Sequence, residues 1–414
     1  MPNLKFLFTL SIIIGSLHSS YQALAQTVYW TGNVDNSWVN PLNWSTNTVP
    51  NAAQEVVIQN TPVPPNMPVL STTTTIERLV IGVGATCTIG AGANLTVDQN
   101  LLNSGSFIVN GGVVNVGNNM NSDGTVNYLS GASFVIANDL TNGGTFNITG
   151  GNVTVQRDFI NLASFTTTVA AGRRLIVRRN FVNDGIFTAS AVGATLEFTG
   201  GGASQLNSNT ALTLHTLLIS KSGSNNVTLN PTTGTAVVVN SDLTIPNNIG
   251  LVLADIGGLS LTVNGNVSVT GNITLNRGMT INGNLAVNAG ATHTMATNGS
   301  LAINNGNLTN AGTFSGNRPT TFGGTTTDNS AGGTGTTTFG AITVNKSGRA
   351  FTFNRPVSAT SFTNTTGNTT FANTANIGGN TVVTAGNVDF NNTCTITGDF
   401  TANGGTTNFT NNTT

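Results

Sequence analysis

Three stretches decide the fold of this chain: residues 98–107 read DQNLLNSGSF, residues 117–126 read GNNMNSDGTV, and residues 137–146 read ANDLTNGGTF. Each stretch places Asn or Asp directly before a large apolar residue. The polar column contains Asn100, Asn119, Asp139, Asp158 and Asn180, and the apolar column contains Leu101, Met120, Leu140, Phe159 and Phe181. A third column, after a turn, is read as Phe107, Val126, Phe146, Phe165 and Phe187. The columns recur about every twenty residues, a period that is typical of one coil of a solenoid.

The coils are predicted to consist of strands. Gly and Asn interrupt every apolar run before two helical turns could form. Around Cys87 and Ile89 the apolar residues alternate with threonines, which is the period of a strand. We therefore predict an all-β fold, a single-stranded parallel β-solenoid, right-handed, whose repeats of roughly twenty residues occupy residues 76–414. Asn266, Asn284 and Asn307 are expected to continue the Asn column.

Composition indicates export and limits the partners. The chain has 414 residues, of which 50 are Gly and 7% are charged, and its formal net charge is −1. This balance favours neither nucleic acid nor an anionic membrane as a partner. Residues 1–25 read as a secretory signal, with Lys5, an apolar stretch and an A-x-A site at 23–25. No later segment has the apolar length of a transmembrane helix. The mature chain is expected to be secreted or on the cell surface.

Residues 26–75 differ from the repeats and are predicted to be an N-terminal cap and lead-in. They contain Trp30, Trp38 and Trp44, which are all the tryptophans of the chain. An open coil end exposes apolar surface and unpaired backbone groups, and a bulky aromatic plug covers both. A platform for binding carbohydrate would also concentrate tryptophan, so this alternative stays open.

The sequence shows little that could support catalysis or metal binding. Cys87 and Cys394 lie far apart, no His lies near either of them, and neither a metal nor another cofactor is expected. The closest approach to paired carboxylates is Asp139 with Asp158, one coil apart. Asp at such a corner more often bonds local backbone. We predict that the chain is not an enzyme.

The main concentration of charge suggests a patch for an anionic ligand such as a glycan or sulfate. It consists of Arg157, Arg173, Arg174, Arg178 and Arg179. The alternative is a solvated corner that Asp158 and Asp184 partly neutralise.

A longer repeat lies over the short one, because residues 195–229 resemble residues 319–353. Each copy carries Lys-Ser-Gly, at Lys221 and at Lys346, and both lysines are expected in exposed turns. Threonine runs such as 166–168 raise the possibility of a surface for binding ice. That function needs regular T-x-T columns, and the threonine positions are read as not keeping register between coils.

The opening W-x-G…W-x-N-P-x-N-W-S and the later K-S-G-x-x-x-V-T-L resemble secreted surface proteins of gliding, polymer-degrading Gram-negative bacteria. These are autotransporter-like or adhesin-like β-helix proteins. The resemblance implies architecture more than activity. Such proteins usually end in a separate C-terminal sorting domain, whereas this chain stops in GGTTNFTNNTT, in mid-repeat.

Together these observations predict a non-catalytic, secreted, structural or adhesive stalk or surface segment. Its expected partners are extracellular polysaccharide or cell-surface components. The alternative is a polysaccharide-active β-helix enzyme, a lyase or hydrolase. Convergence of carboxylates and arginines in one groove would favour the enzyme.

Overall fold

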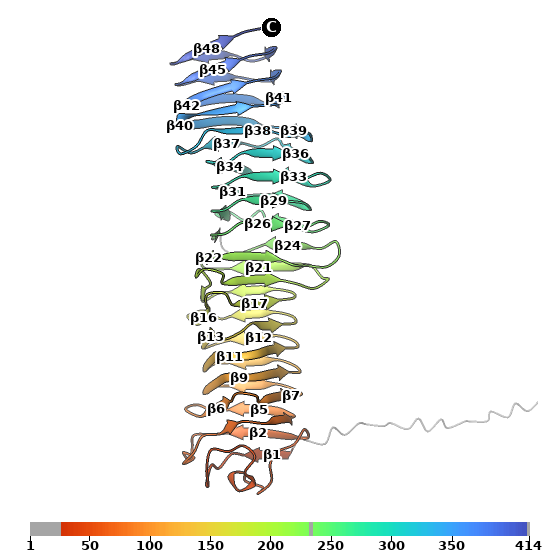
Figure 1. The fold of residues 1–414 in the computed structure, drawn as a ribbon, viewed down its shortest axis with the longest axis vertical. Coiled ribbons are helices and arrows are strands. Elements are labelled where there is room, and N and C mark those ends of the chain that lie inside the picture. Colours follow the sequence, from red (N-terminus) through yellow and green to blue (C-terminus); the bar gives the residue numbers. More distant parts are fainter. Residues whose placement is uncertain (1–25, 232–234, 412–414) are drawn as a thin grey trace, which may run out of the picture.

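The computed structural model describes residues 26–231 and 235–411. The predicted signal segment, residues 1–25, lies outside the described residues. Figure 1 shows short strands stacked coil upon coil along one long axis, with β1 near one end and the C-terminus at the other. Apart from one short 3-10 helix, η1 (Pro41–Asn43), the regular elements of the described part are strands. The strands of successive coils pair in parallel, so the predicted parallel β-solenoid is confirmed.

One face of the rod is a 15-stranded sheet in the described residues, followed by a 3-stranded sheet. The larger sheet contains β1 (Gln26–Tyr29), β2 (Gln54–Ile58), β5 (Arg78–Ile81), β8 (Leu101–Asn103), β10 (Met120–Ser122), β12 (Leu140–Asn142), β15 (Phe159–Asn161), β18 (Phe181–Asn183), β21 (Ser204–Ser208), β24 (Asn226–Leu229), β27 (Gly250–Leu253), β30 (Asn272–Leu275), β33 (Thr292–Met295), β36 (Thr313–Gly316) and β39 (Thr336–Thr338). The smaller contains β41 (Val357–Ala359), β43 (Ala375–Ile377) and β46 (Cys394–Ile396).

The rest of each coil belongs to a 13-stranded sheet in the N-terminal half and a 17-stranded sheet in the C-terminal half, as far as the chain is described. The first contains β3 (Val69–Leu70), β4 (Thr73–Ile76), β6 (Thr86–Ile89), β7 (Asn94–Val97), β9 (Ser106–Val116), β11 (Thr125–Ile136), β13 (Thr145–Ile148), β14 (Val153–Val155), β16 (Thr166–Val169), β17 (Arg174–Val177), β19 (Ile186–Thr188), β20 (Thr195–Phe198) and β23 (Thr216–Ile219). The second contains β22 (Leu212–Leu214), β25 (Ala236–Val239), β26 (Leu243–Ile245), β28 (Ser260–Val263), β29 (Val267–Val269), β31 (Gly278–Ile281), β32 (Leu285–Val287), β34 (Ser300–Asn304), β35 (Leu308–Asn310), β37 (Thr320–Gly323), β38 (Asn329–Gly332), β40 (Ala341–Phe353), β42 (Ser361–Phe371), β44 (Thr381–Val383), β45 (Asn387–Phe390), β47 (Phe400–Ala402) and β48 (Thr406–Phe409).

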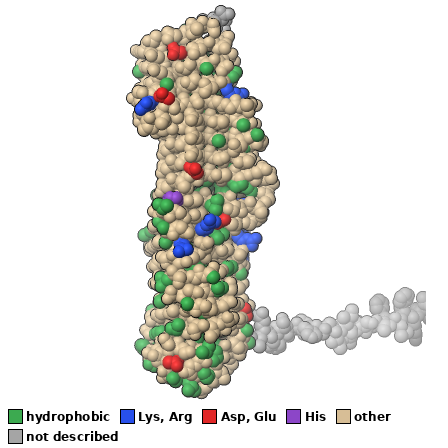
Figure 2. All heavy atoms as spheres, in the orientation of Figure 1, with side chains coloured by type: hydrophobic (Ala, Val, Ile, Leu, Met, Phe, Trp, Pro, Cys, Tyr) green, Lys and Arg blue, Asp and Glu red, His purple; other side chains and the backbone are tan. Residues whose placement is uncertain are grey.

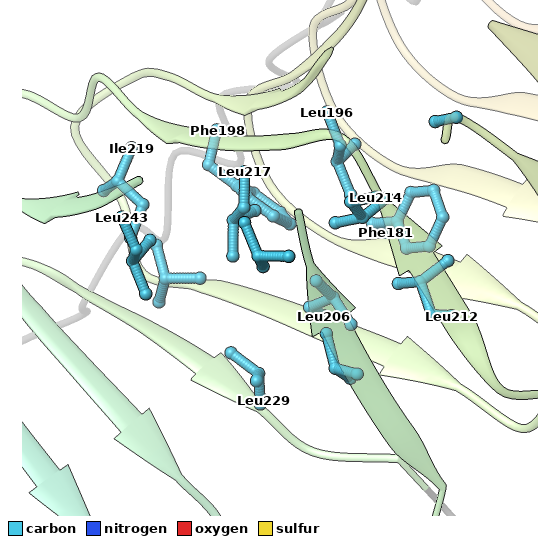
Figure 3. Close-up of a cluster of buried hydrophobic side chains, with 14 of the residues drawn as sticks. Phe181, Leu196, Phe198, Leu206, Leu212, Leu214, Leu217, Ile219, Leu229 and Leu243 are labelled. Carbon is cyan, nitrogen blue, oxygen red and sulfur yellow. The ribbon is translucent and has the colours of Figure 1, made fainter. Parts of the chain in front are cut away.

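A coil contributes one strand to the first face and then two strand segments to the second sheet. Along the chain, β12 on the first face is followed by β13 and β14, which pair with the two halves of β11 one coil below. The core lies between these faces. The apolar column that begins at Leu101 is in register across β8, β10, β12, β15 and β18, and its members are fully buried. Figure 3 shows the continuation of this core around Phe181, Leu206 and Leu229.

The predicted polar ladder is present at the corner that precedes the first face. The side-chain oxygen of each member accepts a hydrogen bond from the backbone N–H of the next, at 3.0 to 3.1 Å. The steps along the ladder are 19, 20, 19 and 22 residues. The ladder therefore satisfies backbone donors at a corner where the strands are interrupted.

A second, buried ladder lies inside the coil and was not predicted. Asn142 donates to the Asn161 amide oxygen at 2.8 Å, and Asn161 donates to that of Asn183 at 2.8 Å. Ser122 and Asn103 occupy the same column one and two coils below Asn142, and all of these side chains are buried. The signal was present in the sequence, because a small polar residue recurs two positions after each large apolar one. Buried amides have to be hydrogen-bonded, and stacked copies of one amide meet that need.

The assignment of Phe165 to the third apolar column is wrong. The residue in register with Phe146 and Phe187 is Thr167, which is fully buried, whereas Phe165 is 37% exposed. The turn between Asn161 and Thr166 is two residues longer than the turn between Asn142 and Thr145 that it pairs with. The Thr167 hydroxyl donates to the Asn161 amide oxygen, so the inner ladder satisfies the polar replacement.

The second half of the Asn column also differs from expectation. Asn266, Asn284 and Asn307 do form a ladder, with N–H···O distances of 2.7 to 2.9 Å that begin at Asp242. This ladder precedes β29, β32 and β35 of the 17-stranded sheet, whereas the first ladder precedes strands of the first face. The two ladders are therefore at different corners, and the predicted continuation is wrong.

One column of threonines on an outer surface keeps register, contrary to expectation, but regular T-x-T columns are not formed there, because Thr168 pairs with Asn147. Thr166 pairs with Thr145, which pairs with Thr125, and the column continues through Ser106 to Thr86. Their side chains are partly exposed, because in these strands the alternate residues point into the core. Part of the 13-stranded sheet therefore carries an ordered hydroxyl column.

The Trp-rich segment packs on the first coils as predicted. The Trp44 ring contacts those of Trp30 and Trp38 edge to face, with centroids 4.8 Å apart in both pairs, and all three side chains are buried. Parallel pairing already starts in this segment, because β1 pairs with β2 and β2 with β5. The tryptophans are not a flat exposed row, so the carbohydrate platform considered for them is not formed by these rings.

Candidate functional site

The arginine patch predicted from the sequence divides between two corners. Arg157, Arg178 and Arg179 follow β14 and β17, next to the first Asn ladder. Arg173 and Arg174 lie at the opposite end of β17, where the Arg173 Nε donates to the Thr149 carbonyl oxygen at 3.1 Å. Two residues of the patch therefore cannot share a small ligand with the other three without a further rearrangement.

Most of the patch is already paired. Arg179 forms a two-point ion pair with Asp158, whose hydrogen bonds raise the pKa of the guanidinium further above its ordinary value. The Arg157 Nε lies 3.6 Å from Asp139, and the Arg174 Nη1 lies 3.0 Å from Glu197. Exposed pairs of this kind contribute little to stability, but they lower the positive potential available to an anionic ligand. Asp158 and Asp184 were both expected to neutralise this corner. Asp158 pairs with Arg179 there, whereas Asp184 accepts a hydrogen bond from the Asn209 amide.

The carboxylates of Asp139 and Asp158 serve the ladder. Each accepts a backbone N–H of the next coil, from Asp158 and Asn180 respectively, in addition to its arginine. In residues 26–231 and 235–411, no three His, Cys, Asp or Glu side chains gather as they would around a metal ion. The same part of the chain has no helix with the length and apolarity needed to cross a membrane.

The cysteines and one histidine are core residues. Cys87 and Cys394 are free and buried, and burial raises the pKa of their thiols to about 12 and about 11. Such thiols carry almost no thiolate at neutral pH. His293 is fully buried and stacks on Phe314 with ring centroids 4.5 Å apart. Burial lowers the pKa of its imidazole to about 4, so the ring is neutral at neutral pH.

Lys221 and Lys346 do not lie in exposed turns, and that expectation is wrong. Lys221 and Lys346 are buried. The Lys221 ammonium donates to the carbonyl oxygens of Arg178 at 3.2 Å and Thr199 at 2.8 Å, and to the Ser204 hydroxyl at 2.7 Å. Burial lowers its pKa to about 8. The burial of these lysines could not be seen in the local sequence, because each ammonium group binds residues of a coil about twenty residues earlier.

A groove lies at the N-terminal end of the described chain. It has a volume of about 450 Å³ and runs between the end of β1 and the loop at 61–65. The groove is lined by Tyr29, Trp30, Thr31, Asn33, Gln59, Thr61, Pro62, Val63, Pro64 and Pro65. The lining carries no formal charge.

The groove is built by the Trp-rich segment. The Trp30 indole N–H donates to the Asn66 carbonyl oxygen at 2.7 Å, and the Asn66 amide donates to the Gly32 carbonyl oxygen at 2.8 Å. Gly32 has φ +60°, and a Cβ at this position would lie 2.2 Å from the Asn66 oxygen. A larger residue would therefore push the 61–65 loop away. Tyr29, at the end of β1, is 43% exposed and presents its ring outside the core.

Two polar side chains of the lining are accessible to a ligand, and a third polar group is buried. The Asn33 and Gln59 side chains are exposed, and the Thr31 hydroxyl oxygen is buried without a hydrogen-bond partner among the described residues. The sequence reasoning missed this groove because it treated the tryptophans as the alternative sugar site. The proline-rich run at 61–65 was the feature of the sequence that could have indicated the groove.

The comparisons with known proteins identify one domain. A family model described as a domain of unknown function, DUF8693, matches residues 29–173, which covers the groove, the Trp cluster and the first coils through β16. Neither the curated proteins nor the solved structures contain a significant match to the chain. The family model describes no activity, so the function has to be argued from the geometry.

Proposed function

We propose that this protein is a non-catalytic structural and adhesive rod that acts outside the cell and contacts glycans. The observation that carries the proposal is the combination of an extended solenoid with an uncharged groove at its N-terminal end. The signal-like segment 1–25 and the resemblance to adhesin-like surface proteins support an extracellular location.

The rod supplies reach and rigidity. Parallel pairing continues from β1 to β48, and both a polar ladder and an apolar column run along the axis. Each coil contacts only its neighbours, so the length of such a molecule can grow without a larger core. Figure 2 shows a surface on which charged side chains are few and scattered, as suits contact with neutral polymers.

The groove supplies chemistry that fits a neutral sugar. An exposed tyrosine ring can pack on the apolar face of a pyranose, while amides and hydroxyls bond its hydroxyl groups. The exposed Asn33 and Gln59 amides provide donors and acceptors at the same groove. The absence of charge in the lining favours a neutral glycan over an anionic one.

Removing the Tyr29 ring should weaken binding to glycan. We expect the purified chain to be retained on insoluble polysaccharides, and Tyr29→Ala to reduce the affinity about tenfold, the effect of about 1.4 kcal/mol of lost ring contact. The measurement is a depletion isotherm on a panel of neutral and anionic polysaccharides. Leu42→Ala is the matched control, because Leu42 is exposed in the same segment but does not line the groove.

Two results would contradict the proposal. Equal loss of binding in both variants, or none in either, would remove the groove from the adhesive role. Release of soluble sugar products by the unsubstituted chain would favour the alternative, a polysaccharide-active enzyme.

The ordered threonine column gives a specific reason for a second candidate, binding to ice. Its members lie in adjacent strands about 4.8 Å apart, a spacing that could hold ordered water. A chain that binds ice through this surface shows thermal hysteresis, and Thr145→Lys, which places a charged side chain in mid-column, abolishes it. A freezing assay without hysteresis would exclude this candidate and leave the glycan proposal untouched.

A further inference from the structure

Lys346 is a buried lysine without a carboxylate partner. It lies in the middle of β40, its side chain is fully buried, and no ion pair involves it in the described part of the chain. The Nζ donates to the Gly323 carbonyl oxygen at 3.0 Å and to the amide oxygen of Asn329. Both partners belong to the preceding coil.

Burial makes the neutral amine of Lys346 easier to form than that of an exposed lysine. An unpaired ammonium is costly to bury, and burial lowers the pKa of Lys346 from its ordinary value. The nearby Asp328 opposes this effect without forming an ion pair, and Arg349 adds to it. A neutral lysine amine has a free lone pair and is a nucleophile.

The group that this amine meets is an electrophile. Asn329 begins β38, and its amide oxygen accepts from the Thr327 hydroxyl at 3.2 Å as well as from Lys346. The Thr327 hydroxyl draws electron density from the attached carbon and stabilises negative charge on the oxygen while the Lys346 amine attacks. The Asp328 carboxylate is held at the same corner, where it accepts from the Ala350 N–H at 2.9 Å.

We propose that Lys346 and Asn329 form an intramolecular isopeptide bond. The Nζ of the neutral lysine attacks Cγ of Asn329, and the bond between Cγ and Nδ2 breaks. The amine gives up a proton, Nδ2 leaves as ammonia, and nothing is oxidised or reduced. Asp328 is the carboxyl group at this corner that could relay the proton. The bond would join β38 covalently to the next coil in β40, across 17 residues.

The first repeat contains a built-in control. Lys221 occupies the position relative to the first Asn ladder that Lys346 occupies relative to the second. The first ladder ends at the Gln205 N–H and the second at the Ser330 N–H. In each case a buried lysine of the next coil contacts the residue just before that end. Where Lys346 meets the amide of Asn329, Lys221 meets the hydroxyl of Ser204. A hydroxyl group has no acyl carbon for the amine to attack, so Lys221 has to remain free.

The test is mass spectrometry of the purified chain. We expect an intact mass lower than the sequence mass by one ammonia. After denaturation and digestion, trypsin should cut after Lys221 but not after Lys346, and fragment spectra should join Lys346 to Asn329. Asn329→Ala should restore both the full mass and cleavage after Lys346.

Two outcomes would overturn the proposal. One is an unsubstituted chain with its full sequence mass and with cleavage after Lys346. The other is a loss of ammonia that maps to another asparagine, such as one cyclised beside a glycine. Neither outcome depends on the folding of a variant, because both are read on the unsubstituted chain, and neither bears on glycan binding.

Discussion

Replacing Trp44 with alanine should cost about 3–5 kcal/mol, the loss expected for a large buried aromatic side chain. Trp44 is 1% exposed and contacts both other tryptophan rings, and its indole N–H donates to the Trp38 carbonyl oxygen at 2.8 Å. The variant would leave a cavity between the Trp-rich segment and the first coils. It would also free the first coils to associate end to end, because the covering segment would loosen.

The loss should be local. A solenoid unfolds in units that contact only their neighbours, so β1, β2 and β5 should lose protection while β11 and β13 keep theirs. Amide hydrogen exchange resolved by peptide measures this difference. Leu42→Ala, at a side chain that is 55% exposed in the same segment, should change exchange little. A uniform loss of protection along the rod would show that the segment is not an independent cap.

Acid should destabilise the rod through His293. The buried imidazole has a pKa of about 4, against an ordinary value of 6.5. Between these values the unfolded chain binds a proton and the folded chain does not, so stability is full above pH 6.5 and falls as the pH is lowered towards 4. The shift corresponds to about 3 kcal/mol.

His293→Leu should remove this dependence. Leucine suits a site between Ile273 and Phe314, and it leaves no unpaired ring nitrogen in the core. Urea unfolding of both chains between pH 4 and pH 8 gives the difference between their free energies of unfolding. The contributions of the carboxylates cancel in this difference, because both chains contain them. His215→Gln should retain the slope of the parent. Curves for the parent and His293→Leu that stay parallel over this range would show that the pKa of His293 is the same in the folded and the unfolded chain.

The repeating pattern of polar and apolar residues was enough to predict most of the architecture. The Asn and Leu or Phe columns recur at nearly constant steps, and a parallel coil places residues one repeat apart directly above each other. The outer ladder could therefore be predicted residue by residue from Asn100 to Asn180. The inner ladder could also have been predicted, since Asn142, Asn161 and Asn183 recur at the same steps.

The candidate site was much less predictable. The five arginines are close in sequence, but β17 separates Arg173 and Arg174 from the others, and carboxylates from other coils neutralise three of them. The groove joins Tyr29 with the loop at 61–65, and a short stretch of sequence does not reveal that they meet.

The sequence by itself determined that this is a parallel β-solenoid with about twenty residues in a coil, a polar ladder at one corner and a buried aromatic cluster near its start. These features follow from repetition, because stacked coils turn a sequence period into a spatial column. Only the tertiary structure decided how each coil deals with its irregularities. A turn two residues longer exchanged Phe165 for Thr167 in the core, the second ladder formed at another corner, and Lys346 entered the interior. The physical reason is that a side chain's surroundings are set by the coils above and below it, so the length of one turn decides which residue meets the core and which partner a buried polar group finds.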